Sequence, residues 1–483
     1  MLVKKENLYQ AFLSQDARFD GRFFVGVSST GIYCRPVCKA KKPAIDNCTF
    51  FETAAAAQKA GYRPCLLCRP ELAPGCFSAR DDLPAQIMNA LKENPEESLE
   101  ALAKRFGYTS RHLRRLFLKE YHVSMVQFRL TCRLLLAKQL LTDTRLSMLD
   151  VALACGFNSL RRFNDAFLRH YHLSPLRLRK DSQNPQEPQD TITLYLGYRP
   201  PYLWDAILQF LKKRAIVGVE LIEDHCYFRT VNLKDHHGVP CTGWLKVSHH
   251  PKNHTLAVGV SASLLPVLSK LLTRITRMFD LDAQPLAIYE TLQNMETLKP
   301  KLDLCGLRLP GCFDDFEMLV RTVLGQQITV AAAGTLTSRL AKAAGTSIET
   351  GISGLDTLFF TPEQLLTYAQ KNQLGSLGII RQRADTILAF TKALLDGSLN
   401  FTLPASDLLS KLLAIKGIGS WSAGYISMRI VNDPDVFLAD DAGINKALPG
   451  YTRKEILQLA EPYQPWRSYV MIGLWHSLAK EES

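Results

Sequence analysis

The stretch LLAIKGIGSWSAGYISMRIVNDPDVFLADDAGINKALPG, residues 412–450, decides the fold of the C-terminal part of the chain. One apolar-periodic segment ends just before Gly417, and a second begins just after Gly419. The two glycines permit a tight hairpin whose backbone N–H groups, at the start of a helix, can meet a phosphate. Asp441 follows Gly419 by 22 residues. The pattern therefore predicts two helices joined by a phosphate-binding hairpin, followed by an acidic residue.

This combination resembles the helix-hairpin-helix DNA glycosylases, with their glycine-rich loop and catalytic aspartate. LPGCFDDFEMLVRTVLGQQITVAAA (309–333) and EPYQPWRSYVMIGLWH (461–476) narrow the resemblance to the AlkA type, the 3-methyladenine glycosylases. The resemblance spans about residues 190–483 and implies a smaller mixed α/β portion before the helical one. It also implies that Asp441 carries catalysis.

The resemblance implies further roles in this region. Bifunctional members carry a lysine in the hairpin that attacks the sugar; this chain has Trp421 there, so we expect a monofunctional enzyme that leaves an abasic site. The Asp441 carboxylate would stabilise the positive charge that develops on the sugar, whereas Asp440 is expected to be a capping or structural acid. Trp421, Tyr425 and Trp475 fall at the family's base-pocket positions, where aromatic rings favour a flipped, cationic alkylated purine.

Gln327 departs from the family pattern. The well-known member of the family has an apolar residue here, wedged into the gap that the flipped base leaves, and a glutamine stacks less well. We expect Gln327, Gly417 and Gly419 to contact DNA, but the means of holding the duplex open is left undecided. A glycosylase for oxidised bases is the less favoured alternative, because the lysine nucleophile is missing.

Four cysteines near the N-terminus form a second chemical signal. GIYCRPVCKA (31–40) and RPCLLCRP (63–70) contain Cys-x3-Cys and, after 26 intervening residues, Cys-x2-Cys. Two close pairs of thiolates suit tetrahedral Zn²⁺, which would close a domain too small to have much core. Two unrelated pairs of buried thiols are the alternative, and Cys48 and Cys76 are expected to be ordinary thiols. The predicted ligands of one zinc ion are Cys34, Cys38, Cys65 and Cys68.

The sequence around these cysteines resembles the N-terminal domain of Ada-type methyl-phosphotriester repair proteins, over about residues 1–80. The resemblance implies that Cys34 is both a zinc ligand and the nucleophile that takes a methyl group from a DNA phosphotriester and keeps it. Zinc would hold the sulfur as thiolate, its nucleophilic form. The basic residues expected to hold the DNA backbone are Arg35, Lys39, Lys41 and Lys42. A purely structural zinc site is the alternative.

Residues 84–180 contain a loose duplication. SLEALAKRFGYTSRHLRRLFLKEY (98–121) and SMLDVALACGFNSLRRFNDAFLRHY (147–171) each predict a helix, a Gly-aromatic turn, a polar cap (Thr109, Asn158) and a second helix. The segment resembles the two-part helix-turn-helix domain of AraC-type activators, which places such helices in the DNA major groove. The expected DNA contacts are Arg111, Arg114, Arg115, Arg161 and Arg162. The residues expected in the core are Phe163, Phe167 and Tyr171.

The charge of the chain favours a polyanionic partner for its first third. Residues 1–181 contain 29 Lys and Arg against 17 Asp and Glu, and residues 182–483 contain 29 of each, so the net charge of +12 lies in the first part. Such a surplus is typical of nucleic-acid binding, although solubility alone would also explain it. The chain lacks the apolar run of about 18 residues that a membrane span needs, and MLVKKENLYQ lacks the apolar stretch of a signal peptide. We therefore expect no membrane partner.

These patterns predict a multidomain α+β protein. The expected domains are a small zinc-bound α/β domain (1–80), an all-α double helix-turn-helix domain (84–180), a linker (181–190), a mixed α/β domain (191–300) and an all-α helix-hairpin-helix glycosylase domain (301–483). The histidines of the strand region lack a metal-binding arrangement and are expected at the surface: His225, His236, His237, His249, His250 and His254.

The resemblances together imply a bifunctional alkylation-damage response protein. A glycosylase for alkylated purines would be fused to a transcriptional activator that accepts a methyl group on zinc-bound Cys34. The expected partners are damaged and promoter double-stranded DNA and RNA polymerase, in the cytoplasm of a bacterium and with its nucleoid. The alternative is a DNA-binding regulator with a structural zinc site and an inactive glycosylase fold.

Overall fold

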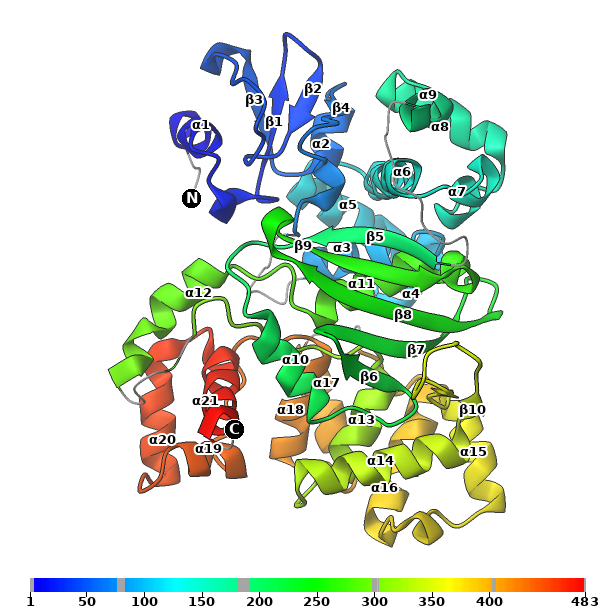
Figure 1. Cartoon of the computed structure of the whole chain (residues 1–483), viewed down its shortest axis with the longest axis vertical. Helices are drawn as coiled ribbons and strands as arrows, with labels where there is room; N and C mark the ends of the chain where they lie inside the picture. Colours follow the sequence, from blue (N-terminus) through cyan, green and yellow to red (C-terminus); the bar gives the residue numbers. More distant parts are fainter. Residues whose placement is uncertain are drawn as a thin grey trace.

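The computed structural model describes residues 4–75, 83–180, 191–297, 302, 304–401 and 405–481; the predicted linker at 181–190 and Cys76 lie outside the described residues. The chain forms four consecutive units that pack against one another (Figure 1). A small sheet with helices is followed by an all-helical unit, a five-stranded sheet with helices and a large helical unit. This is the multidomain α+β architecture expected from the sequence.

The N-terminal unit is built on a sheet of order β3-β1-β2-β4, in which β2 and β4 are parallel and the other pairs antiparallel. Val25 of β1 is fully buried and belongs to one small apolar core with Phe12 of α1. The elements are α1 (Lys5–Leu13), β1 (Phe24–Val27), β2 (Ile32–Cys34), β3 (Cys48–Phe51), α2 (Ala54–Lys59) and β4 (Arg63–Pro64). Because β2 ends at Cys34 and β4 runs into Cys65, the parallel pairing brings the two cysteine pairs together.

The second unit repeats one helix-turn-helix motif on either side of α6. Its elements are α3 (Leu83–Glu93), α4 (Leu99–Phe106), α5 (Ser110–Tyr121), α6 (Met125–Asp143), α7 (Met148–Ala154), α8 (Leu160–Tyr171) and α9 (Pro175–Lys180). The Thr109 hydroxyl caps α5 as predicted, but α8 is capped by Ser159 and not by Asn158. Phe163, Phe167 and Tyr171 are buried, as predicted.

The third unit is an antiparallel sheet of order β5-β9-β8-β7-β6, which crosses the middle of the molecule in Figure 1. Its elements are β5 (Thr191–Gly197), α10 (Trp204–Lys212), β6 (Glu220–Glu223), β7 (Cys226–Lys234), β8 (Pro240–His250), β9 (Thr255–Ser261) and α11 (Leu268–Met278). Leu140 and Leu141 of α6 belong to the same buried apolar cluster as Ile192 and Leu194 of β5. The two halves of the chain therefore share a core.

The fourth unit has two helical lobes. One contains α13 (Asp315–Leu324), α14 (Val330–Ala344), α15 (Pro362–Lys371), α16 (Arg381–Leu395), α17 (Ala405–Leu413) and α18 (Ser420–Ile430). The other contains α12 (Pro285–Leu292), α19 (Ala442–Ala447), α20 (Arg453–Ala460) and α21 (Arg467–Glu481). Each lobe has its own apolar cluster. A short ribbon of β10 (Thr346–Ser347) and β11 (Thr357–Leu358) interrupts the predicted all-α domain. In the described ranges, no helix is long and apolar enough to cross a membrane.

Candidate active site and zinc centre

A cavity of about 1110 Å³ opens between the two helical lobes and the end of α10. It is lined by residues of α10, the α13–α14 connection, the hairpin before α18, α18 itself, α19 and α21. The predicted site residues that line it are Gln327, Gly417, Gly419, Trp421, Tyr425, Asp441 and Trp475. The fold thus gathers into one cavity residues that are separated by up to about 150 positions in the chain.

Asp441 is held by four hydrogen bonds. It is the N-cap of α19, and its Oδ1 accepts from the backbone N–H groups of Gly443 at 2.9 Å and Ile444 at 3.1 Å. Oδ1 also accepts from Trp475 Nε1 at 2.8 Å, and Oδ2 accepts from Trp421 Nε1 at 3.2 Å. Oδ1 carries three of these bonds, so Oδ2 is the oxygen with remaining capacity to face a reacting group.

The hairpin before α18 needs its first glycine. Gly417 has φ +96°, and a Cβ there would lie 2.0 Å from Oγ1 of Thr386, so only glycine fits. Gly419 is the N-cap of α18 and offers no side chain to block its first turn. Gln326 Nε2 donates to the Gly417 carbonyl at 2.8 Å and ties the hairpin to the α13–α14 connection. The hairpin is therefore fixed, with the amides of the first turn of α18 available to an anion.

Aromatic rings form one side of the cavity. Trp421 and Tyr425 lie one turn apart on α18 and stack, with centroids 5.2 Å apart and planes at 7°. Trp475 lies 6.3 Å from Tyr425 and stacks on Phe210 of α10 at 6.3 Å. Phe210 was not predicted, since it lies about 230 residues before Asp441. The rings provide flat apolar surface for a planar ligand.

Two arginines stand behind the rings and were also not predicted. Arg429 is the next residue on the face of α18 that carries Trp421 and Tyr425, and this spacing of four is the signal that could have found it. Its Nη1 donates to the Tyr425 hydroxyl at 2.6 Å, and Arg214 lies 3.8 Å from the Phe210 ring centroid. Burial alone would raise the pKa of Tyr425, but Arg429 and Arg214 outweigh it and hold the pKa below its ordinary value.

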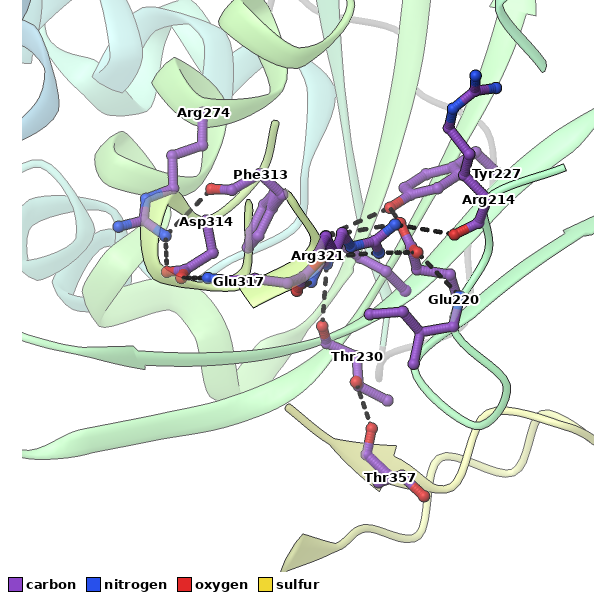
Figure 2. Close-up of polar contacts among 12 residues, drawn as sticks. Arg214, Glu220, Tyr227, Thr230, Arg274, Phe313, Asp314, Glu317, Arg321 and Thr357 are labelled. Atoms are coloured by element: carbon purple, nitrogen blue, oxygen red, sulfur yellow. Dashed lines mark hydrogen bonds and ion pairs between the residues drawn. The ribbon is translucent and has the colours of Figure 1, made fainter. Parts of the chain in front are cut away.

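A buried charge cluster supports the cavity wall at Arg214 (Figure 2). Arg321 donates to the Arg214 carbonyl at 2.8 Å and pairs with Glu317 at 2.7 Å and with Glu220. Arg229 pairs with Glu317 at 2.7 Å. Burial would raise the pKa of Glu220, but Arg321 and Arg229 lower it. The two acids and two arginines balance, which buried charges require, and they fix the chain at Arg214 to the sheet and to α13.

Asp440 and Gln327 are both exposed, but they lie in different surroundings. Asp440 is exposed and pairs with Arg453 at 2.7 Å, away from the hydrogen bonds of Asp441. It does not cap a helix, because Asp441 does so. Gln327 is exposed at the mouth of the cavity with φ +56°.

The four N-terminal cysteines form one cluster. Their sulfur atoms all lie within 4.8 Å of one another. Tetrahedral zinc with Zn–S bonds of about 2.3 Å separates sulfurs by about 3.8 Å, so the donor set fits one zinc ion. Cys34 is 6% exposed. The Arg35 backbone N–H lies 3.3 Å from Sγ of Cys68 and donates to it. Cys48 lies in the same core but outside the cluster.

Two basic residues expected to contact DNA also have partners inside the domain. Arg35 donates from Nε to Asp20 at 2.8 Å and from Nη1 to the Cys68 carbonyl at 3.1 Å. Lys42 donates to the Cys38 carbonyl at 2.5 Å and lies over the Phe12 ring. Both side chains are half-buried, so their contact with the DNA backbone stays a prediction; sequence position beside the cysteines does not show which charges also have partners inside the domain. The remaining two lysines of the predicted set, at 39 and 41, are exposed.

The predicted DNA-contacting arginines of the helix-turn-helix unit are Arg111, Arg114, Arg115, Arg161 and Arg162, and all are exposed on α5 and α8. Arg114 pairs with exposed Glu100 at 3.3 Å, a contact of little energetic weight that a phosphate could replace.

His249 differs from its prediction as a surface residue. Its Nε2 lies 2.6 Å from the Tyr198 hydroxyl, and its ring stacks on Trp204 at 5.6 Å. Burial lowers the pKa of this histidine. Side chains alternate between the two faces of β8, and His249 lies on the face that packs against α10. The sequence prediction treated all the histidines of this segment alike and so missed this position.

Fold and site together define a helix-hairpin-helix base-excision glycosylase joined to an Ada-type zinc domain and a helix-turn-helix domain. Family models match in the same order: the metal binding domain of Ada (7–71), a helix-turn-helix domain (102–181), the AlkA N-terminal domain (193–314) and the HhH-GPD superfamily of base excision DNA repair proteins (320–452).

The chain belongs to the family of bifunctional transcriptional activator/DNA repair enzymes. A probable bifunctional transcriptional activator/DNA repair enzyme AlkA of Mycobacterium tuberculosis is 34% identical over 98% of this chain and 96% of its own length. DNA-3-methyladenine glycosylase 2 of Escherichia coli is 35% identical over 58% of this chain and 96% of its own length. The bifunctional transcriptional activator/DNA repair enzyme Ada of Escherichia coli is 38% identical over 23% of this chain and 30% of its own length.

Proposed function

We propose that the C-terminal half is a monofunctional DNA glycosylase that hydrolyses the N-glycosidic bond of alkylated purines such as 3-methyladenine. The hydrogen bonding of Asp441 is the observation that carries this proposal. Two indole N–H groups and a helix N-terminus hold one carboxylate at the wall of an aromatic cavity. A structural capping acid would not need both indoles, which here orient each oxygen of the carboxylate.

The chemistry follows from that placement. The bond between the sugar carbon C1′ and the purine nitrogen breaks, the base leaves with the electron pair, and positive charge develops on the sugar. The Oδ2 atom of Asp441 faces that charge and stabilises it at the wall of the cavity. A water molecule then adds to C1′ and loses a proton, which leaves an abasic site.

The cavity suits a flipped, planar and cationic base. A base must leave the duplex stack to be reached, and the stacked pair Trp421 and Tyr425 offers an electron-rich face to it. Arg429 and Arg214 lie behind the rings, engaged with Tyr425 and Phe210, so they stiffen the aromatic wall.

Base release from alkylated duplex DNA tests the proposal, with Asp441→Asn and Asp441→Ala compared. Asparagine still caps a helix, whereas alanine does not, which costs about 1 kcal/mol. We expect both variants to lose base release by about 100-fold or more, with the thermal midpoint lowered only in Asp441→Ala. Full activity in Asp441→Asn, or no base release by the parent protein, would favour a regulator with an inactive glycosylase fold.

The absence of lyase chemistry is tested separately. Lys213 and Lys446 line the cavity, although Trp421 occupies the hairpin position of the lysine nucleophile. We expect borohydride to trap no covalent complex between the protein and damaged DNA. Trapping that is lost in Lys446→Arg or Lys213→Arg would show a lysine that forms an imine with the sugar.

We propose that Cys34 accepts a methyl group from DNA methyl-phosphotriesters. Its sulfur attacks the methyl carbon, the carbon–oxygen bond breaks, and the phosphodiester leaves as an anion, so that a thioether remains. Bound zinc would keep the sulfur as thiolate until it reacts. Since Cys34 is only 6% exposed, the assignment to this cysteine rests on its place in the Ada-type sequence. Peptide mass spectrometry after exposure to methylated DNA should find about 14 Da added at Cys34; addition at another cysteine, or none, would contradict it.

We propose that the helix-turn-helix unit binds promoter DNA and makes the protein a transcriptional activator. In this role it contacts RNA polymerase, and the protein works at the bacterial nucleoid. Methylation of Cys34 removes one negative charge from the zinc site and reduces its repulsion of DNA phosphates. Promoter affinity should therefore rise after stoichiometric methylation, and unchanged affinity would contradict this switch.

A further inference from the structure

The turn between the second pair of predicted zinc ligands exposes two leucines that neither proposed reaction uses. Leu66 and Leu67 separate Cys65 from Cys68, and 45% and 65% of their surfaces are exposed. Single exposed leucines are common on protein surfaces. Here two adjacent leucines lie in a turn without a charged residue, in the part of the chain that carries the net positive charge. Beside a site expected to meet DNA, lysine or arginine would be the ordinary choice.

Both ends of this turn are held in place. The Cys65 N–H donates to the Tyr33 carbonyl at 2.9 Å. At the other end, the Cys68 carbonyl accepts from Arg35 Nη1 at 3.1 Å. Arg69, the next residue, is paired with two acidic side chains. The two leucines are therefore presented by a fixed backbone, so little conformational entropy is lost when a ligand contacts them.

The leucines lie beside the most exposed of the four clustered cysteines. Cys68 is half-buried, whereas the other three are buried. The four sulfur atoms lie within 4.8 Å of one another, so a group that approaches the cluster past Cys68 also comes close to Sγ of Cys34. Leu67 directly precedes Cys68 in the same turn. A DNA backbone that takes this path meets the leucine turn.

Apolar side chains discriminate between the two forms of a backbone phosphate. An ordinary phosphodiester is an anion, and contact with a leucine removes water from it without a compensating partner. A methyl phosphotriester is neutral and carries a methyl group whose removal from water is favourable. The exposed lysines at positions 39 and 41 can hold neighbouring, charged phosphates. An apolar contact beside the sulfur cluster thus favours the damaged phosphate over undamaged ones.

We propose that Leu66 and Leu67 form the contact surface for a methylated backbone phosphate and select it over the ordinary phosphodiester. The inference rests on the proposed methyl-acceptor function of Cys34 and names the residues that give this function its specificity. Both leucines act in binding, before the methyl group moves, and neither takes part in the bonds that form or break.

Binding of two DNA duplexes by the zinc-loaded full chain tests the assignment without methyl transfer. One duplex has a single methylphosphonate linkage, which is neutral and whose methyl group is bonded to phosphorus and cannot be transferred; the other is unmodified. The ratio of the two dissociation constants at one salt concentration measures the preference, because contacts made by the rest of the protein are common to both duplexes.

The variants compared are Leu66→Gln/Leu67→Gln and Leu66→Met/Leu67→Met. Glutamine and methionine are similar in size and uncharged but differ in polarity, so the comparison isolates the apolar contact from the charge of the site. Leu13→Gln, at the end of α1 where the leucine is 39% exposed, is the control. Every variant should bind one zinc ion per chain, measured by atomic absorption, because the substituted side chains are exposed.

We expect the parent, the methionine variant and Leu13→Gln to prefer the methylphosphonate duplex equally. The glutamine variant should lose about 10-fold of this preference, as the loss of partly buried leucine contacts predicts. If the double glutamine variant loses zinc, Leu67→Gln alone decides, with an expected loss of about threefold. An unchanged ratio in the glutamine variant, or an equal loss in the methionine variant, would overturn the assignment.

Peptide mass spectrometry of the parent separates this result from the proposed function. If exposure to methylated DNA adds no methyl group at Cys34, the acceptor function fails. If the methyl group is added but the glutamine variant keeps the full preference, only the role of Leu66 and Leu67 is overturned.

Discussion

The indole nitrogen of Trp475 on α21 donates a hydrogen bond of 2.8 Å to Oδ1 of Asp441 on α19. The bond joins two helices of one lobe and orients the carboxylate toward the cavity. Trp475→Phe keeps an aromatic ring and removes the donor. Hydrogen bonds to charged groups contribute roughly 1.5–3 kcal/mol, so we expect kcat for base release to fall about 10- to 100-fold with little change in KM. A variant with raised KM and unchanged kcat would show that Trp475 serves base binding alone.

Gly443 makes the approach of these two residues possible. A Cβ at this position would lie 2.8 Å from Trp475 Cδ1 and 3.0 Å from Asp441 Oδ1. Alanine normally stabilises a helix relative to glycine by about 1 kcal/mol. Gly443→Ala should nevertheless lower base release, because the methyl group displaces the indole from the carboxylate. The measurement is activity together with thermal midpoint. Gly375→Ala is the control and should keep full activity, because a Cβ there meets open space and Gly375 is not among the residues that line the cavity.

Tyr425 gives the cavity a pH dependence at alkaline pH. Burial raises the pKa of its hydroxyl, but Arg429 and Arg214 dominate and hold the pKa below 10. As pH rises, the folded protein therefore releases this proton before the unfolded chain does. The contribution of Tyr425 to the free energy of unfolding increases as pH rises from the pKa of the folded state toward 10. We expect ultraviolet difference spectra to show one early-titrating tyrosine that Tyr425→Phe lacks. A parent and variant with identical titrations would contradict the arginine effect.

Ionisation of Asp280 lowers the stability of the folded protein as pH rises through the acid range, whereas ionisation of Tyr425 raises it at alkaline pH. It is 4% exposed, its Oδ2 accepts from Tyr469 and from the Leu309 N–H, and burial raises its pKa from 3.8 to about 6. The folded state binds the proton more tightly, so stability falls as pH rises from about 4 to 6, and the full cost, on the order of 3 kcal/mol, is present above pH 6. Asparagine can accept the same two hydrogen bonds without charge. The thermal midpoints of Asp280→Asn and of the parent are measured as a function of pH. The difference between them, variant minus parent, should increase from about pH 4 to 6 and then level off. A difference that does not change with pH would contradict the assignment.

The resemblance to helix-hairpin-helix glycosylases rests on short contiguous motifs, and it predicted those candidate site residues that one helix or hairpin presents. Trp421 and Tyr425 are four residues apart on α18, and the hairpin glycines immediately precede them. Asp441 follows in the same segment. The four cysteines were predictable because a metal imposes its ligand spacing on the turns that hold it.

Residues brought in by tertiary packing could not be found this way. Phe210 and Arg214 reach the cavity only because α10 docks between the two lobes, and no periodicity in their own segment records that contact. Arg35 and His249 illustrate the same limit, since a polar side chain in an otherwise ordinary segment folds inward when it has partners there. Residues of α6 and β5, which come before and after the predicted linker in the chain, share one apolar core. The composition of the linker had predicted a domain boundary but could not show that the domains on its two sides pack together.

Bound zinc should stabilise the helix-turn-helix unit as well as the zinc domain, because residues near the zinc ligands are linked to α6 by hydrogen bonds. Tyr33, next to Cys34, accepts from Gln58 at 3.0 Å, and Gln58 accepts from Thr131 of α6 at 3.0 Å. Glu71 accepts from buried Lys138 of α6 at 2.6 Å. Removal of zinc by a chelator should therefore lower both the thermal midpoint and the affinity for promoter DNA. Base release should persist below the transition, since the cavity lies in the other half.

Cys38→Ser and Cys48→Ser provide matched variants for this prediction. Both cysteines are buried in one small core, but only Cys38 belongs to the four-sulfur cluster. Cys38→Ser should lose the zinc ion and reproduce the chelated state, because loss of one thiolate ligand weakens a site whose binding energy is folding energy. Cys48→Ser should keep one zinc per chain, measured by atomic absorption, and its promoter affinity. Equal zinc content in the two variants, or promoter affinity that survives the loss of zinc, would show that α6 is held independently of the metal site.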